Sequence, residues 1–267
     1  MQHTHALIGY GEAGSTFAAA ARWREEVTVW DRAPERRDAA ASAGLRTAPS
    51  PAEVLSATPL VLSLVTADQS LRAAQDYASL LAPGALWCDM NSVAPETKRA
   101  AARAITAAGG HYIDVAVLAP VEPSRLAVPL LISGDAAEEA LAMLRSIGFR
   151  DLRAIGREVG RASAIKMIRS VMIKGVEALT DEMMAAAQRA DVTEEVLASL
   201  DASEKLKPWA ERAAYNLERM ATHGLRRAAE MEEVAKTLTA LDVAPVMTNG
   251  TVLRQRAAAG RGQQQET

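Results

Sequence analysis

The sequence predicts an α/β domain with a doubly wound, mainly parallel sheet, followed by an all-α domain, the two being joined by a long helix. Short runs of aliphatic and β-branched residues alternate with alanine-rich stretches over the first 156 residues. This alternation is typical of a parallel sheet covered by helices. After residue 156 the apolar residues recur only at helical spacing. The chain of 267 residues is long enough for two medium-sized domains.

Seven apolar runs in the first part of the chain are expected to be strands. They are Ala6–Gly9, Val27–Trp30, Leu60–Val65, Ala85–Cys88, Tyr112–Val117, Leu130–Ser133 and Phe149–Ala154. Four stretches between them have helical periodicity: Ser15–Trp23, Ser70–Leu81, Pro95–Ala108 and Ala136–Ile147. Because strand and helix alternate, residues 1–156 are expected to form the domain that contains the sheet.

The second part of the chain is expected to be helical. Its first helix runs from Glu158 to Gln188, roughly eight turns, because apolar residues follow one another at helical spacing without a proline. Further helices are predicted at Thr193–Leu200, Ala202–Arg219, Leu225–Leu241 and Val246–Ala258. Residues 157–259 would then form an all-helical domain, and Gly260–Thr267, which is rich in glycine and glutamine, a disordered tail.

Charge and composition exclude several classes of protein. With 30 basic and 33 acidic residues the chain has a net charge of −3, which does not favour nucleic-acid binding. No apolar run approaches the roughly 20 residues that span a bilayer, and the N-terminus lacks the pattern of a secretory signal. The single cysteine excludes an intramolecular disulfide. We therefore expect a cytoplasmic protein without nucleic-acid or membrane partners, and the histidine spacing predicts no metal site.

A glycine-rich turn follows the first predicted strand. Residues 9–14 read Gly-Tyr-Gly-Glu-Ala-Gly, which fits G-x-G-x-x-G, and a helix is expected directly after them. Gly9 and Gly11 allow the tight turn and the approach of a pyrophosphate to backbone amides, and Gly14 allows helix and strand to pack closely. Glu12 and Ala13 complete the turn. These residues predict the dinucleotide site of a Rossmann domain.

An acidic residue lies where such a site needs one. Asp31 ends the second strand, 20 residues after Gly11, and its carboxylate is expected to accept hydrogen bonds from the adenosine ribose. The next residue, Arg32, is suited to stacking on adenine or to pairing with a 2′-phosphate. NAD and NADP both remain open, with NAD favoured. Val65 and Thr66 follow another strand end and are expected to line the cofactor cleft.

With these motifs the chain resembles the β-hydroxyacid dehydrogenase superfamily, which includes 3-hydroxyisobutyrate and 6-phosphogluconate dehydrogenases. Residues 89–95, Asp-Met-Asn-Ser-Val-Ala-Pro, resemble the family's D-x-S-T-x-x-P turn. The resemblance implies that Asn91 and Ser92 lie beside the nicotinamide ribose. Residues 160–166, Gly-Arg-Ala-Ser-Ala-Ile-Lys, resemble the segment that carries the family's catalytic lysine. Lys166 is therefore expected to be the general acid/base.

Helical spacing places two further polar residues on the face of the helix that carries Lys166. Ser170 and Lys174 follow at i+4 and i+8. Lys174 or Ser170 is expected to hold the substrate while Lys166 moves the proton. The alternative is that this face is the solvated side of an amphipathic helix.

Two departures from the family pattern affect the substrate prediction. The family's D-A-P-V-S-G-G reads Asp-Val-Ala-Val-Leu-Ala-Pro at residues 114–120, so Leu118 replaces the serine that binds substrate. The asparagine expected four residues after the lysine is Ser170. Residues 223–231 resemble a helical domain of uncharacterised role in phosphogluconate-dehydrogenase-like proteins. There His223 and Arg226 would bind a carboxylate or phosphate, and surface ion pairs are the alternative.

The sequence therefore predicts an NAD(P)-dependent oxidoreductase that transfers a hydride between nicotinamide and a small hydroxy acid, keto acid or semialdehyde. Two alternatives remain open: an imine reductase of the same architecture, and a protein that binds NAD(P) without turnover as a sensor or scaffold. The resemblance implies a homodimer formed by the long helix and the C-terminal domain, with Met172, Met183 and Met184 in the interface. Because only ten residues are aromatic, an acidic substrate is favoured over a large hydrophobic one.

Overall fold

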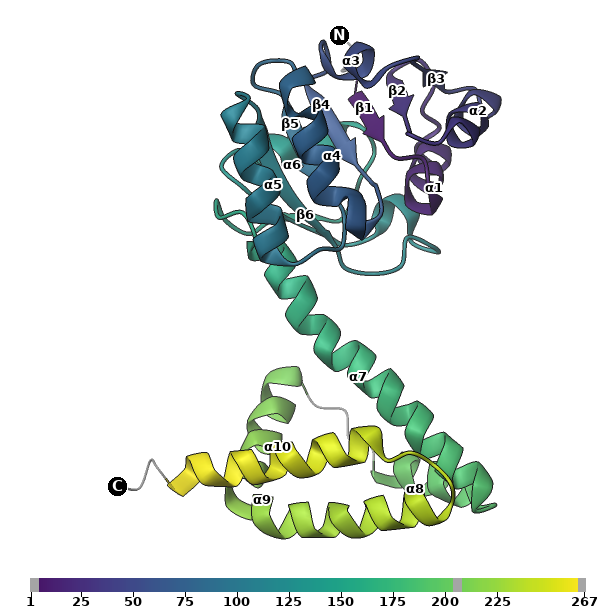
Figure 1. The fold of residues 1–267 in the computed structure, drawn as a ribbon, viewed down its shortest axis with the longest axis vertical. Coiled ribbons are helices and arrows are strands. Elements are labelled where there is room, and N and C mark those ends of the chain that lie inside the picture. The colour runs from purple at the N-terminus through teal and green to yellow at the C-terminus, as the bar shows by residue number, and fades with distance from the viewer. Residues whose placement is uncertain (1–4, 204–207, 264–267) are drawn as a thin grey trace. The chain divides into compact units, whose positions relative to one another are not determined.

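The computed structural model of the chain describes residues 5–203 and 208–263. The chain divides into two compact units between residues 169 and 170. The first unit contains a sheet and its covering helices, and the second contains helices in its described part (Figure 1). Among the described residues, every helix is too short or too polar to traverse a bilayer.

One sheet of eight strands organises the described residues of the first unit. The strands are β1 His5–Ile8, β2 Val27–Trp30, β3 Arg46–Thr47, β4 Leu60–Ser63, β5 Leu86–Asp89, β6 His111–Val117, β7 Leu130–Ser133 and β8 Leu152–Ala154. Their order is β3-β2-β1-β4-β5-β6-β7-β8. All neighbours are parallel except β6 and β7. The predicted doubly wound, mainly parallel sheet is confirmed.

The strand order reverses between β1 and β4, which is the topological switch point of the sheet. After β1 the strands continue to one side as β2 and β3, and β4 then returns to the other side of β1. Loops that leave β1 and β4 at their carboxyl ends therefore diverge. In open α/β sheets ligands bind in the crevice at such a switch point.

Helices cover both faces of the sheet. They are α1 Glu12–Ala21, α2 Pro34–Ser42, α3 Pro51–Leu55, α4 Ser70–Tyr77, α5 Pro95–Ala107 and α6 Ala137–Ser146, with 3₁₀ turns η1 Ala67–Gln69, η2 Ala78–Leu80 and η3 Arg125–Ala127. In Figure 1, α4 and α5 lie over the same face. Alternate residues of each buried strand enter opposite cores: in β4, Leu60 and Leu62 pack with Phe17 of α1, whereas Val61 packs with Ile105 of α5.

Some elements of the first unit differ from those expected. The strand β3 has two residues, too few to show a periodic pattern. The helices α2 and α3 were not predicted, although each begins with a proline in its first turn, a position that proline favours. The helix α1 begins at Glu12, three residues before the expected Ser15, because the last glycine of the turn already belongs to the helix.

The described part of the second unit is helical, which confirms the predicted class. Its elements are α7 Arg161–Arg189, which begins in the first unit, α8 Thr193–Ser203, α9 Trp209–Ala240 and α10 Val246–Gln263. The prediction of separate helices at 202–219 and 225–241 is wrong, since α9 passes through Gly224 without a break. A Cβ at Gly224 would lie 2.4 Å from the Gln255 carbonyl oxygen of α10. This glycine serves close helix packing and does not end the helix.

The end of the chain also differs in part from expectation. The helix α10 continues to Gln263, beyond the predicted end at Ala258 and into the segment expected to be disordered. The remaining tail, residues 264–267, lies outside the described residues.

A buried carboxylate holds the start of α10 against α7. Glu182 accepts hydrogen bonds from the backbone amides of Met247 (2.7 Å) and Thr248 (2.9 Å) and from the Thr248 hydroxyl (2.6 Å). Burial alone would raise the pKa of Glu182, but these hydrogen bonds outweigh it and hold the pKa below its usual value. The carboxylate therefore stabilises the folded state most when it is ionised.

Replacing Glu182 by glutamine is expected to lower the free energy of unfolding by about 1.5–3 kcal/mol at pH 7, because charged hydrogen bonds to the helix start are lost. Since the folded pKa is depressed, the wild-type advantage is complete above the unfolded value of about 4.3 and shrinks as the pH falls through the folded value. Urea unfolding at pH 7 and below pH 4 measures both effects. The neighbouring exposed Asp181→Asn is the control, and an equal loss at both pH values would contradict the prediction.

Candidate dinucleotide and acid/base site

The glycine turn connects β1 to α1 at the switch point. Gly9 has a φ of +97°, and a Cβ there would lie 2.4 Å from the Leu64 carbonyl oxygen after β4. A Cβ at Gly14 would lie 2.5 Å from the Gly9 carbonyl oxygen, whereas one at Gly11 would meet no protein atom within 4 Å. Gly9 and Gly14 thus permit the close packing of the turn, and Gly11 leaves open space beside it. That space adjoins the N-terminus of α1, where backbone amides and the helix dipole favour an anion.

The carboxylate of Asp31 is held in place beside this turn. One oxygen accepts from the Tyr10 backbone amide at 2.8 Å and the other from the Ala33 amide at 2.9 Å. The first bond ties the end of β2 to the glycine turn. Each carboxylate oxygen has a further lone pair with which to accept a hydroxyl.

A cavity of about 530 Å³ opens at the carboxyl ends of β1, β2 and β4. Of the predicted cofactor residues, Gly9, Gly11, Asp31, Arg32, Val65 and Thr66 line it. Glu12 and Ala13 stand in the first turn of α1 and are not among the lining residues. The structure therefore brings together in one cavity residues from three strand ends that are distant in sequence.

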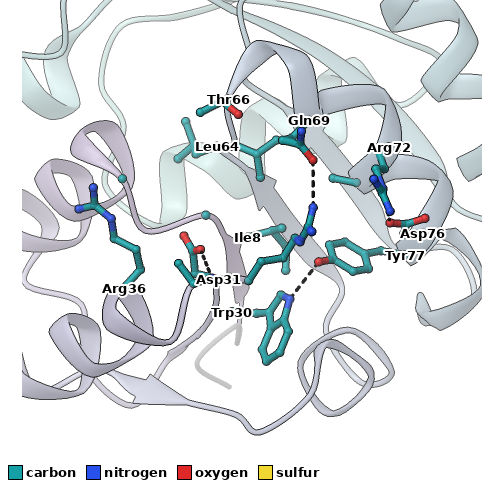
Figure 2. A pocket seen from close by; sticks show the side chains of 16 residues that line it. Ile8, Trp30, Asp31, Arg36, Leu64, Thr66, Gln69, Arg72, Asp76 and Tyr77 are labelled. Atoms are coloured by element: carbon teal, nitrogen blue, oxygen red, sulfur yellow. Dashed lines mark hydrogen bonds and ion pairs between the residues drawn. The ribbon is translucent and has the colours of Figure 1, made fainter.

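Several other lining residues were not among the predicted cofactor-binding residues. They are Arg36 on α2, Gln69 on η1, and Arg72, Asp76 and Tyr77 on α4. Figure 2 shows the Trp30 indole donating to the Tyr77 hydroxyl at 3.0 Å and Arg72 paired with Asp76 at 3.4 Å. Arg32 donates to the Gln69 side chain at 3.0 Å. For Arg72, Asp76 and Tyr77 the available signal was their position on the helix after β4, because that helix starts at the switch point.

A second group of polar residues follows β5. The Asn91 side chain is buried, and its amide nitrogen donates to Asp89 Oδ1 at 2.8 Å and to Ser63 Oγ at 3.2 Å. Because a carboxylate only accepts, the amide orientation is fixed. The other end, Asn91 Oδ1, is buried and has no hydrogen-bond partner among the described residues. A buried acceptor of this kind is costly unless a ligand or an ordered water donates to it.

The start of α7 meets the loops that follow β5 and β6. Lys166 is partly buried, and its Nζ donates to Ser92 Oγ. One turn further along, Arg169 donates from Nη1 to the Leu118 carbonyl oxygen at 3.0 Å. The predicted residues Lys166, Ser92 and Leu118 thus lie at one end of the sheet, with Arg169 added by the structure. Arg169 was missed because its contact with Leu118 spans 51 residues.

The helix α7 begins at a carboxylate from the sheet. Asp114 on β6 accepts from the Gly160 amide at 3.1 Å and from the Ser163 amide and hydroxyl at 2.9 Å each. A carboxylate at this position stabilises a helix start by satisfying its first amides. Asp114 therefore determines where α7 leaves the sheet, three residues before Lys166.

The remaining predicted site residues belong to the second unit. Ser170 is partly buried on α7, and His223 and Arg226 are exposed on α9. The Lys174 side chain lies outside the described part of the structure. Among the residues that the structure describes, no group of three or more His, Cys, Asp or Glu side chains is arranged to hold a metal ion. The proposed substrate roles of these four residues stay predictions.

The switch-point cavity, the glycine turn and the orphaned Asn91 oxygen fit a dinucleotide, so the fold and site define an NAD(P)-binding Rossmann domain. The NAD binding domain of 6-phosphogluconate dehydrogenase matches residues 4–156, and a domain of unknown function, DUF1932, matches residues 187–258. The chain belongs to the family that carries this NAD-binding domain. Its architecture is that of the hydroxyacid dehydrogenases, as the sequence motifs predicted.

Relatives cover nearly the whole chain. A conserved hypothetical protein of Sinorhizobium meliloti is 36% identical, with 97% of this chain and 89% of that one covered and a TM-score of 0.64. Another conserved protein of unknown function, structurally similar to 3-hydroxyacid dehydrogenases, is 32% identical over 97% and 99% of the chains, with a TM-score of 0.64. An uncharacterised 28.5 kDa protein of Methanothermus fervidus is 25% identical over 92% and 94%.

Imine reductases share the fold. The Streptomyces aurantiacus enzyme has a TM-score of 0.78 over 97% of this chain and 95% of its own, at 22% identity. This likeness concerns the arrangement of the backbone. The family itself is shown by the match to the NAD binding domain of 6-phosphogluconate dehydrogenase.

Proposed function

We propose that the protein is an NAD(P)-dependent dehydrogenase or reductase of a small hydroxy acid or keto acid, with Lys166 as the general acid/base. The observation that carries this proposal is the hydrogen bond from Lys166 Nζ to Ser92 Oγ, next to the unpartnered oxygen of Asn91. An amine in this setting is suited to exchanging a proton with a substrate oxygen. The nicotinamide, when bound, accepts or supplies the hydride.

The chain's own residues divide the remaining work. Gly9, Gly11 and Asp31 would hold the adenosine and pyrophosphate, and Asn91 Oδ1 would accept a hydrogen bond from the nicotinamide half. Oxidation of an alcohol removes a hydride from carbon and a proton from oxygen. Lys166 would take that proton, and in reduction it would return the proton to the carbonyl oxygen. Ser92 would orient the Lys166 amine in both oxidation and reduction.

An acidic substrate is supported by Arg169. Its guanidinium lies one turn from Lys166 and contacts Leu118, at the segment where the family's Ser-Gly-Gly is absent. Guanidinium groups bind carboxylates in a bidentate manner. The Arg169 guanidinium would thus bind the substrate carboxylate in place of the family's uncharged Ser-Gly-Gly segment.

The proposed reaction is tested by following reduced nicotinamide absorbance with hydroxy acids, keto acids, semialdehydes and cyclic imines. Turnover of acids supports the proposal. Turnover confined to imines would favour the imine reductase alternative, and cofactor binding without any turnover would favour the sensor.

Arg169→Ala is expected to raise KM for the acidic substrate by about 10–100-fold, because a charged hydrogen bond contributes about 1.5–3 kcal/mol. The KM of the corresponding methyl ester should change little, because the ester lacks the charge. Initial rates with the acid and its ester measure the difference. An equal rise for both would show that Arg169 does not recognise the carboxylate.

We assign the cofactor preference to Asp31 and Arg32, which follow β2, and the Asp31 carboxylate favours NAD. Asp31→Ala is expected to weaken NADH binding by about tenfold, the value of a hydrogen bond of roughly 1.4 kcal/mol, and NADPH binding less. Arg32→Ala is expected to show the opposite order, because a guanidinium attracts the 2′-phosphate. Calorimetric titration of both variants measures this, and equal effects of Asp31→Ala on both cofactors would contradict the assignment.

The long helix is the proposed site of homodimer formation. It exposes a row of large apolar side chains: Ile165, Ile168, Val171, Met172, Ile173, Val176 and Leu179, with exposed fractions from 41 to 75%. Such a row in water favours burial against a second copy of the same helix. Sedimentation velocity should give twice the chain mass of 28.4 kDa, and a monomer at micromolar concentration would contradict the proposal.

A further inference from the structure

A buried ammonium group lies beneath the proposed acid/base site. The side chains of Lys98 on α5, Asp89 on β5 and Asp114 on β6 are all fully buried. Lys98 Nζ donates to Asp89 Oδ1 at 3.0 Å and to the Asp89 carbonyl oxygen at 2.6 Å. It also lies 3.5 Å from Asp114 Oδ1, which makes an ion pair without a hydrogen bond. One cation therefore bridges two carboxylates that belong to neighbouring strands.

Asp89 and Asp114 each hold one part of the proposed acid/base site in place. Asp89 accepts from the backbone and side-chain amides of Asn91, the residue before Ser92. Asp114 accepts from Gly160 and Ser163 at the start of α7 and so determines where Lys166 stands. The two parts meet in the contact between Lys166 and Ser92.

The negative charge of Asp89 is stabilised by several groups around it. Burial would raise the pKa of Asp89, but the Lys98 ammonium, the Tyr112 hydroxyl and the Asn91 amide outweigh burial and keep that pKa below its usual value. Burial next to Asp89 raises the pKa of Tyr112 well above its usual value, so the hydroxyl stays protonated and donates at 2.5 Å. Ser70 donates to the same carboxylate at 2.9 Å. Buried charges are costly to maintain, and apolar residues would often pack as well.

We propose that Lys98 is a positioning residue: by bridging Asp89 and Asp114 it fixes the Asn91–Ser92 turn relative to the start of α7 and so holds Ser92 against Lys166. This inference rests on the proposed function of Lys166. Lys98 itself touches neither substrate nor cofactor, because its side chain is fully buried among the two carboxylates.

Lys98→Met is the principal test, since methionine keeps the length of the side chain and removes the charge. We expect kcat to fall by about 10²-fold, as misplacement of reacting groups by about 1 Å can cost that much. The dissociation constant of adenosine should not change, because adenosine lacks the nicotinamide half that Asn91 would contact and its cavity lies at other strand ends. In a Ser92→Ala background Lys98→Met should add little further loss. If the fold-losses in kcat of the two single variants multiplied in the double variant, Lys98 would not act through Ser92.

A matched variant separates positioning from general destabilisation. Leu144→Ala opens a cavity at a fully buried site on α6, and it should lower the melting temperature while kcat per folded molecule stays at the wild-type value. If Lys98→Met does not fold, Ser163→Ala takes its place, because it removes the hydroxyl that donates to Asp114 and to the Gly160 carbonyl oxygen and leaves the backbone amides in place. It should lower kcat by roughly tenfold, the equivalent of one hydrogen bond. A wild-type kcat in the variant that folds would overturn the proposal.

A second readout needs no substrate. Amine-specific labelling of the intact protein, followed by mass spectrometry of the peptide with Lys166, reports the surroundings of that amine. The Lys98 variant, or Ser163→Ala in its place, should change the labelling rate by about threefold or more, as expected for coupled residues. An unchanged rate would overturn the positioning role, whatever the reaction is. If the rate changes but Lys166→Met keeps full activity, the positioning of the amine stands and the proposed function fails.

Discussion

Replacing Lys166 by methionine is expected to lower kcat by about 10²–10⁴-fold, the usual contribution of a general acid/base. Methionine fills a similar volume but neither accepts nor donates a proton at the substrate oxygen. The dissociation constant of NAD(P)H should stay at its wild-type value, because the cavity that contains Asp31 does not include Lys166. Steady-state kinetics with the best substrate of the panel, together with a calorimetric titration of the cofactor, measure the two quantities.

The control for this experiment is Arg161→Met. Arg161 is an exposed cation in the first turn of the same helix, and its loss should leave kcat unchanged. If Lys166→Met kept full activity, another group would have to move the proton. If both variants lost activity equally, the helix start and not the amine would be the sensitive feature.

Two glycines of the same turn are expected to respond in opposite ways to alanine. Gly9→Ala should lower the free energy of unfolding by about 2–5 kcal/mol, because its φ of +97° and a Cβ 2.4 Å from the Leu64 carbonyl both strain the turn. Gly11→Ala should leave stability unchanged, since its φ is −81° and its Cβ would meet no protein atom. The same Cβ would fill the space beside the start of α1 and weaken NAD(P)H binding by about 10–100-fold, or roughly 1.4–2.8 kcal/mol.

Urea unfolding and calorimetric titration of both glycine variants give the comparison directly. Adenosine, which has no pyrophosphate, serves as the control ligand, and its affinity for Gly11→Ala should equal that for the wild type. A loss of NADH affinity without a loss of adenosine affinity would locate the pyrophosphate at Gly11. Undiminished NADH affinity in Gly11→Ala would show that the cofactor does not approach this turn.

Much of the fold was predictable because its signals are local. Strand runs such as Val27–Trp30 and Leu130–Ser133 coincide with β2 and β7, since aliphatic and β-branched residues favour strands. The errors occurred where local signals were absent or misleading. The strand β3 is too short for a pattern, and two helices were predicted at 202–219 and 225–241 although α9 continues through Gly224, whose lack of a side chain serves contact with α10.

By itself the sequence determined the Rossmann class, the glycine turn and the position of Asp31 after β2. These depend on backbone conformations and strand ends that a few consecutive residues specify. Only the tertiary structure decided that Lys98 lies between Asp89 and Asp114, and that Lys166 meets Ser92 across 74 residues of chain. A lysine in a polar stretch of a helix gives no sign of burial, because its partners come from other strands. The proposed acid/base site therefore depends on contacts that arise only when the sheet and α7 come together.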